Sequence, residues 1–100
     1  MRLMLSEIVA STNGQLQGSD VEVRGLSHDS RQVNAGDLFV ALSGEHSNGH
    51  DFAAKAIDRG AAAVLTERRV DGDFAQLVVN DARLAMGQIA ALWRNQLDNL

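Results

Sequence analysis

The chain has 100 residues, of which 45% are hydrophobic and 22% are charged, and its formal net charge is −4. This composition predicts one folded, soluble domain, and the negative charge disfavours a general nucleic-acid or anionic-membrane surface, so neither is expected as a partner. The absence of cysteine excludes disulfides and thiolate chemistry. The opening residues are too short an apolar stretch for a signal peptide and no run reaches membrane-spanning length, so we expect a cytoplasmic location.

The amino-terminal quarter of the sequence predicts one helix and two short strands. Residues 5–10 favour a helix that Ser6 caps and that Asn13-Gly14 ends. Residues 15–17 and 21–23 are typical of short strands that are exposed on one side.

The middle of the sequence alternates apolar strands with helices. Residues 38–42 contain no polar side chain and predict a central strand buried on both faces. A helix is expected at 51–59 and further strands at 61–65 and 76–79, with a polar loop at 68–73. A strand, a helix and a strand in this order predict a crossover unit within one sheet.

The last expected element is a long helix that Asn80 or Asp81 caps. Its apolar residues recur at helical spacing and are Ala82, Ala85, Met86, Ile89, Leu92, Trp93 and Leu97. We expect Met86 and Trp93 to pack in the core or against another domain rather than to bind a ligand. The fold class that follows is α/β, a single domain with a mixed sheet and packed helices.

The most informative segment joins a polar cluster, His28-Asp29-Ser30-Arg31, to the apolar strand at 38–42. The cluster offers a cation, a hydroxyl and hydrogen-bond acceptors beside a buried strand, which suits a polar ligand. The alternative is a solvated turn in which Asp29 and Arg31 form a local pair.

Catalytic chemistry is not favoured by the residues of this chain. His46 and His50 lack the further ligands that a zinc site needs. The Ser, His and Asp of the polar cluster are adjacent, so on a strand their side chains would alternate in direction and could not form a catalytic relay. Lys55 is the only lysine and no glycine precedes it, which excludes the Gly-Lys pair of an ATP-binding phosphate loop. We therefore expect no catalytic residue, metal ion or cofactor here.

Blocks of this sequence resemble, in order, the amino-terminal domain of the Mur ligases, which build the peptidoglycan stem peptide. The blocks are Asp29-Ser30-Arg31, Leu38 to Leu42, Asn48-Gly49-His50-Asp51-Phe52, Gly60 to Leu65 and Asp81 to Ala85. Within the family, the His50 block and the last block resemble the members that add D-alanyl-D-alanine. The members that add the third stem-peptide residue, which tend to carry arginine where His50 stands, are the alternative.

The resemblance implies that this domain holds the UDP end of a UDP-N-acetylmuramoyl-peptide. The substrate-binding positions that it implies are His28, Ser30, Arg31, Glu45, His46, Ser47 and Asn48. A serine hydroxyl and backbone groups can match the donor–acceptor edge of uracil. The phosphates lack an evident cationic partner, because Glu45 and Asp51 bring carboxylates close and the loop between them has no arginine. Arg31, other domains or solvent would then have to compensate.

The resemblance also implies that the whole enzyme uses ATP and magnesium to phosphorylate the substrate's terminal carboxylate, which the amine of D-alanyl-D-alanine then attacks. The central ATP-binding domain and the carboxyl-terminal domain would lie outside these 100 residues. We therefore expect this chain to be inactive alone and to position the substrate for the remaining domains. A different interpretation is a non-catalytic module that binds a nucleotide sugar or a protein.

Overall fold

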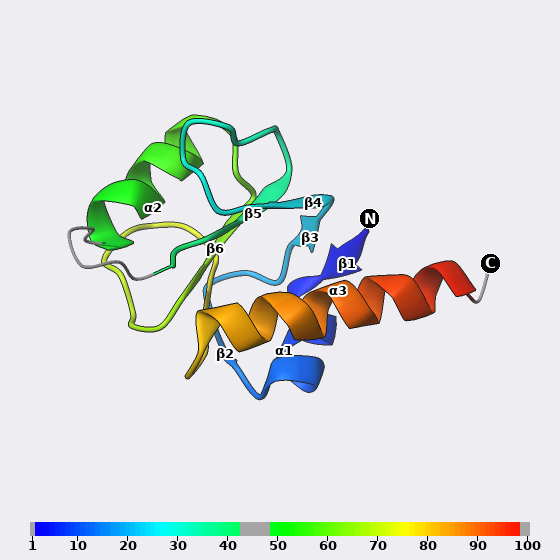
Figure 1. The fold of residues 1–100 in the computed structure, drawn as a ribbon. Coiled ribbons are helices and arrows are strands. Elements are labelled where there is room, and N and C mark those ends of the chain that lie inside the picture. The colour runs from blue at the N-terminus through cyan, green and yellow to red at the C-terminus, as the bar shows by residue number, and fades with distance from the viewer. Residues whose placement is uncertain (1, 43–48, 99–100) are drawn as a thin grey trace.

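A mixed five-stranded sheet lies at the centre of the structure, a computed structural model that describes residues 2–42 and 49–98. The elements are β1 (Leu3–Met4), α1 (Leu5–Thr12), β2 (Gln15–Gln17), β3 (Glu22–Val23), β4 (Gly25–Ser27), β5 (Asp37–Val40), α2 (Gly49–Asp58), β6 (Ala63–Thr66), β7 (Gln76–Val78) and α3 (Ala82–Asp98). The strand order is β2-β7-β6-β5-β4, with β2 antiparallel to β7 and the other neighbours parallel (Figure 1).

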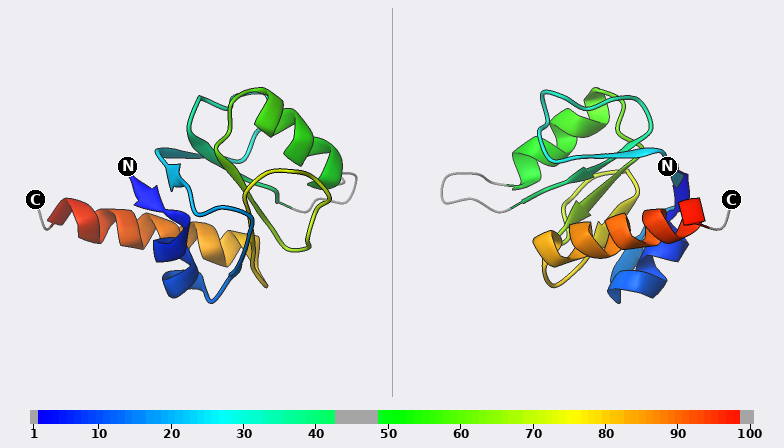
Figure 2. Two further views of the ribbon diagram at one scale, coloured as in Figure 1. Left: turned by 180° about the vertical axis from the view of Figure 1, so that it is seen from behind. Right: turned by 45° about the vertical axis from the view of Figure 1, so that its right-hand side comes forward.

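Helices cover both faces of this sheet, with α2 on one side and α1 and α3 on the other (Figure 2). Successive residues of β5 and β6 point to opposite faces, as strand geometry requires. Leu38 and Leu65 join the core cluster under α1 and α3, whereas Phe39 and Val64 join the cluster under α2. The parallel β5-α2-β6 unit and the α/β fold class are thus confirmed.

The amino-terminal helix begins one residue before the expected cap. Leu5 donates its backbone N–H to the Val21 carbonyl at 3.0 Å, and the helix begins at this residue. The Glu7 carboxylate accepts the Met4 backbone N–H at 3.1 Å, so the prediction that Ser6 caps α1 was wrong. The predicted end is confirmed, since Asn13 adopts a left-handed conformation with φ 56°.

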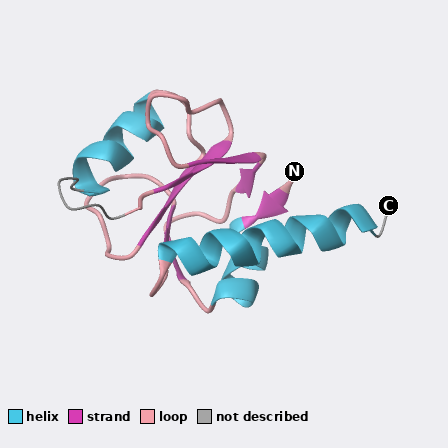
Figure 3. Cartoon of the chain, in the orientation of Figure 1, coloured by secondary structure: helices cyan, strands magenta, loops and turns pink. Residues whose placement is uncertain are grey.

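The long carboxyl-terminal helix is capped by Asp81, whose carboxylate accepts the Leu84 backbone N–H at 3.1 Å. The expected core positions near its start are buried, but Trp93 and Leu97 are 39% and 49% exposed. Trp93 therefore does not pack in the core of this domain, because the second half of α3 extends beyond the five-stranded sheet (Figure 3). The alternative, a contact with another domain, stays a prediction. Within the described ranges, no helix is long and apolar enough to cross a membrane.

Candidate functional site

The polar cluster borders an open pocket of about 860 Å³ on the α2 face of the sheet. One wall is the connection from β4 to β5, the other is α2, and the floor is the carboxyl-terminal half of β5 and the residues that follow it. The lining residues are His28, Asp29, Ser30, Arg31, Phe39, Ala41, Leu42, Phe52, Lys55, Asp58 and Arg59. The volume lies within the range of small-molecule sites, and the carboxyl ends of parallel strands are where such sites occur in open α/β sheets.

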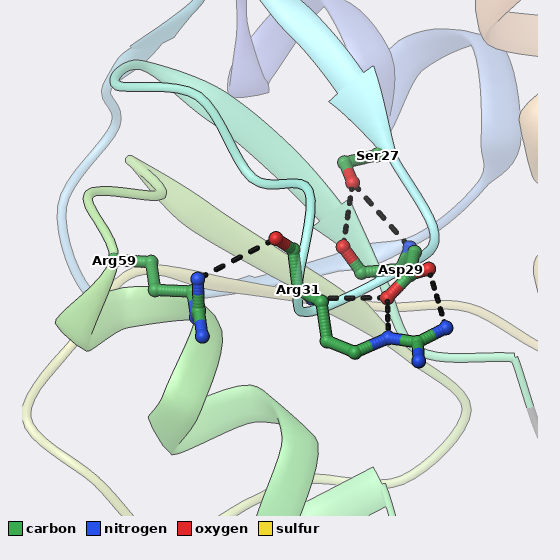
Figure 4. A network of polar contacts seen from close by, with 4 residues as sticks. All are labelled: Ser27, Asp29, Arg31 and Arg59. Atoms are coloured by element: carbon green, nitrogen blue, oxygen red, sulfur yellow. Dashed lines mark hydrogen bonds and ion pairs between the residues drawn. The ribbon is translucent and has the colours of Figure 1, made fainter.

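The wall formed by the β4–β5 connection is held in shape by its own side chains (Figure 4). The Ser27 hydroxyl donates to the Asp29 carbonyl at 3.0 Å and accepts the Asp29 N–H at 3.4 Å. The Asp29 carboxylate then accepts the Arg31 backbone N–H at 2.9 Å and two guanidinium N–H bonds at 3.1 and 3.0 Å. The pairing of Asp29 with Arg31 across a turn is thereby confirmed.

This pairing also favours the charged forms of both side chains. The hydrogen bonds from the Arg31 side chain and backbone lower the pKa of the Asp29 carboxyl from 3.8 to about 2. The hydrogen bond from Asp29 raises the pKa of the Arg31 guanidinium in return. Arg31 is therefore committed to an internal partner, although its side chain is 83% exposed.

Ser30 lies between the two paired residues and differs from them in burial. It is only 8% exposed and lines the pocket. Among the described residues its hydroxyl has no hydrogen-bond partner. A pocket-lining hydroxyl with both its donor and its acceptor capacity free can bind a polar ligand group. His28 also lines the pocket but is exposed, at its outer edge.

The opposite wall presents one stripe of α2 to the pocket. Phe52, Lys55 and Arg59 are three and four residues apart, so they follow one another along the same helix face. The Lys55 ammonium lies over the Phe52 ring, 5.6 Å from its centroid. One Arg59 guanidinium N–H donates to the Arg31 carbonyl at 3.4 Å, which ties the end of α2 to the facing wall (Figure 4).

A second contact fixes the distance between the two walls. Gly60 follows α2 with φ 110°, a conformation that favours glycine, and its carbonyl accepts the Gly36 N–H at 3.0 Å. A Cβ at this position would stand 3.4 Å from the backbone of Ala35. The glycine therefore allows the β4–β5 connection and the end of α2 to approach closely.

The structure brings together three of the seven predicted substrate-binding residues, His28, Ser30 and Arg31. The other four predictions, Glu45, His46, Ser47 and Asn48, lie outside the described residues. Within the described ranges, no group of three or more His, Cys, Asp or Glu residues could hold a metal ion.

The prediction from sequence missed the contribution of α2. From the sequence alone, Lys55 serves only to exclude a phosphate-binding loop, and no role is assigned to Arg59. The signal that could have found them is their spacing of four residues on the helix that follows the central strand, on the face that also carries Phe52.

Comparison with known proteins gives concordant results. The family model "Mur ligase family, catalytic domain" matches residues 22–94. The chain is 45% identical over 93 residues to the UDP-N-acetylmuramoyl-tripeptide–D-alanyl-D-alanine ligase of Escherichia coli K12, which covers 93% of the chain. It is 42% identical over 93 residues, 89% of the chain, to the UDP-N-acetylmuramoyl-L-alanyl-D-glutamate–2,6-diaminopimelate ligase of Syntrophomonas wolfei.

A solved structure shows the same fold. Crystal structure II of MurF from Acinetobacter baumannii superposes on the whole chain with a TM-score of 0.83 and 35% sequence identity. The chain spans about a fifth of the length of these relatives: 21% of the E. coli protein, 19% of the S. wolfei protein and 22% of the A. baumannii chain.

Proposed function

The chain belongs to the Mur ligase family, and from this we propose that it is the domain that binds the uridine diphosphate end of a UDP-N-acetylmuramoyl-peptide. The observation that carries the proposal is the position of Ser30. Its hydroxyl, which has no hydrogen-bond partner among the described residues, lies beside the Asp29–Arg31 turn at the wall of a pocket large enough for a nucleotide. The relatives whose names state a UDP-linked substrate give the ligand class.

The chemistry of the pocket supports a nucleotide rather than a purely apolar or purely ionic ligand. Its floor contains Phe39 and Ala41, which can contact the flat apolar surface of a base. The hydroxyl of Ser30 can pair with the polar edge of that base, and an edge left unpaired in a closed site would cost about 1–3 kcal/mol per group. The pocket thus combines a contact surface with a source of base specificity.

Calorimetric titration of the 100-residue chain with UDP, CDP and ADP tests this proposal. We expect UDP to bind most tightly, because CDP presents an amino donor where uracil presents a carbonyl acceptor and ADP carries a larger base. The same titration with Ser30→Ala should reduce the preference for UDP. Equal affinities for the three nucleotides, or no binding of UDP at millimolar concentration, would contradict the proposal.

In the whole enzyme, the domain would position its substrate for an ATP-dependent ligation in peptidoglycan synthesis. The 100 residues contain one lysine and no Gly-Lys pair, so they do not fit a phosphate-binding loop for ATP and magnesium. The chemistry would then belong to other domains, and this domain would hold the nucleotide end so that the distant carboxylate is correctly placed. We expect the 100-residue chain to hydrolyse no ATP above a mock purification.

We propose D-alanyl-D-alanine as the amino acceptor of the whole enzyme. The His50 block and the E. coli relative, at 45% identity, favour this member of the family. The diaminopimelate-adding member is the second candidate, because the S. wolfei relative is nearly as similar at 42% identity. Incubation of the full-length protein with ATP, the matching UDP-muramoyl-peptide and either acceptor separates them: product with diaminopimelate alone would contradict our proposal.

A further inference from the structure

The α2 wall of the pocket carries cations to which no role has yet been assigned. Lys55 and Arg59 both line the pocket from α2, whereas the third cation, Arg31, lies on the facing wall. Two carboxylates, those of Asp29 and Asp58, also line it, so the described lining carries more cations than carboxylates in a chain whose net charge is −4. The pocket is therefore locally positive on a negative domain.

The three cations are not equally available to a ligand. Both Arg31 donors that face Asp29 are used in the bidentate pair at 3.1 and 3.0 Å. Lys55 has a ring contact with Phe52 at 5.6 Å and, among the described residues, no hydrogen bond or ion pair, so its N–H donors can reach an oxygen anion. Arg59 uses Nη1 for a long, 3.4 Å bond to a backbone carbonyl. Its remaining guanidinium donors can still form charge-assisted hydrogen bonds.

From this geometry we propose that Lys55 and Arg59 bind the diphosphate of the uridine nucleotide, an inference that rests on the proposed function of the pocket. Lys55 lies in the last turn of α2, and Arg59, the residue after the helix, donates its backbone N–H to the Lys55 carbonyl at 3.1 Å, which continues the helical pattern. Both side chains line the same pocket, so two neighbouring phosphates can each meet a cation. Arg31 instead keeps the β4–β5 turn in shape. Lys55 and Arg59 would thus supply the cations that the sequence between Glu45 and Asp51 lacks.

A structural role for the same cations makes a different prediction. Both lie at the carboxyl-terminal end of α2, where positive charge also offsets the helix dipole. Neutral substitutions would then lower the stability of the domain and leave nucleotide affinity unchanged. Binding and stability must therefore be measured on the same variants.

The test compares uridine, UDP and inorganic pyrophosphate as ligands of the 100-residue chain by calorimetry. The variants are Lys55→Gln and Arg59→Gln, and Arg94→Gln on the exposed surface of α3, across the sheet from the pocket, is the matched control. We expect each α2 variant to weaken UDP binding about threefold to tenfold and to leave uridine affinity unchanged. Arg94→Gln should change neither affinity, and added salt should weaken UDP binding less in the α2 variants.

One further variant changes the sign of the expected effect. Asp58→Asn removes a carboxylate from the same rim, so it should strengthen UDP binding about twofold without affecting uridine. A gain of affinity cannot be explained by a damaged fold. An unchanged or lower affinity for UDP would overturn the inference.

The outcomes separate this inference from the proposed function. If uridine and UDP bind and the α2 variants leave UDP affinity unchanged, the diphosphate assignment is overturned while the nucleotide pocket stands. If neither uridine nor UDP binds the unmodified chain, the proposed function and the diphosphate assignment are both overturned. If pyrophosphate binds as tightly as UDP, the pocket recognises anions without the nucleoside, which overturns the proposed function. The assignment of Lys55 and Arg59 then depends on whether their variants weaken pyrophosphate binding.

Discussion

The Asp29 carboxylate accepts three hydrogen bonds from Arg31, one from the backbone and two from the guanidinium, and Ser30 lies between these two residues. The paired side chains use their polar groups on each other. The small residue between them is buried at the pocket wall, and its hydroxyl has no hydrogen-bond partner among the described residues. A motif of three consecutive polar residues therefore separates into a structural pair and one ligand-binding candidate.

The ion pair makes the stability of the folded chain dependent on pH. The pKa of Asp29 is lowered to about 2 in the folded chain, so the pair stabilises the fold fully above the unfolded value near 4. This contribution is lost as the pH falls from about 4 through about 2. Arg31→Gln should raise the pKa of Asp29 toward 3.8, measured as the carbon chemical shift of its carboxyl group.

The same variant gives a second readout. The stability difference between Arg31→Gln and the unmodified chain should shrink as the pH is lowered from about 4 to about 2. Arg24→Gln is a suitable control, because Arg24 pairs with Glu22 away from this turn. An Asp29 pKa that stays near 2 in Arg31→Gln would show that the guanidinium is not the cause.

Ser30→Ala should separate binding from folding. We expect UDP affinity to fall about tenfold, which corresponds to about 1.4 kcal/mol. The free energy of unfolding should change by less than about 1 kcal/mol, because the hydroxyl has no partner within the described part of the chain. Ser19→Ala, at an exposed position, is the matched control for both measurements.

In the full-length enzyme the same substitution should raise KM for the UDP-muramoyl substrate about tenfold and leave kcat nearly unchanged. The lost contact would serve the ground state and the transition state alike, since it lies far from the reacting carboxylate. A variant that melts several degrees lower and binds its substrate normally would show that Ser30 has a structural role instead.

Thr66, at the end of β6, provides a prediction about stability alone. Thr66 is 3% exposed, and its buried hydroxyl oxygen has no hydrogen-bond partner within the described structure. Thr66→Val should therefore raise the free energy of unfolding by about 1 kcal/mol in urea denaturation, because it removes an unpaired buried polar group. The converse change on the same sheet face, Val64→Thr, should lower it. A loss of stability in Thr66→Val would mean that the hydroxyl is paired.

The order of elements could be predicted from sequence because the apolar runs are strong and well separated. Leu38 lies in the apolar run 38–42 and Val64 in the apolar run 61–65, and such runs are buried wherever the sheet forms. The start of α1 could not be predicted in the same way. It is set by the contact of Leu5 with Val21, sixteen residues away, which local capping preferences do not reveal.

The site was predictable only where one short segment forms it. The turn around Ser30 is formed by residues adjacent in sequence, and their types indicate a turn. Lys55 and Arg59 join the pocket because the crossover places α2 opposite that turn, a relationship that depends on tertiary structure. For Trp93, helical spacing left open whether the side chain packs in the core or against another domain, and its exposure here excludes only the core.

The most direct test of the central claim is a titration of the ¹⁵N-labelled chain with UDP, followed by amide chemical shifts. We predict that shifts concentrate at residues 27–31 and 52–59, which contain the two walls of the pocket, and at residues 44–51. The polar loop at 68–73 should remain unchanged and serves as the internal control. Shifts confined to 68–73, or none at millimolar UDP, would contradict the assignment of this pocket as the nucleotide site.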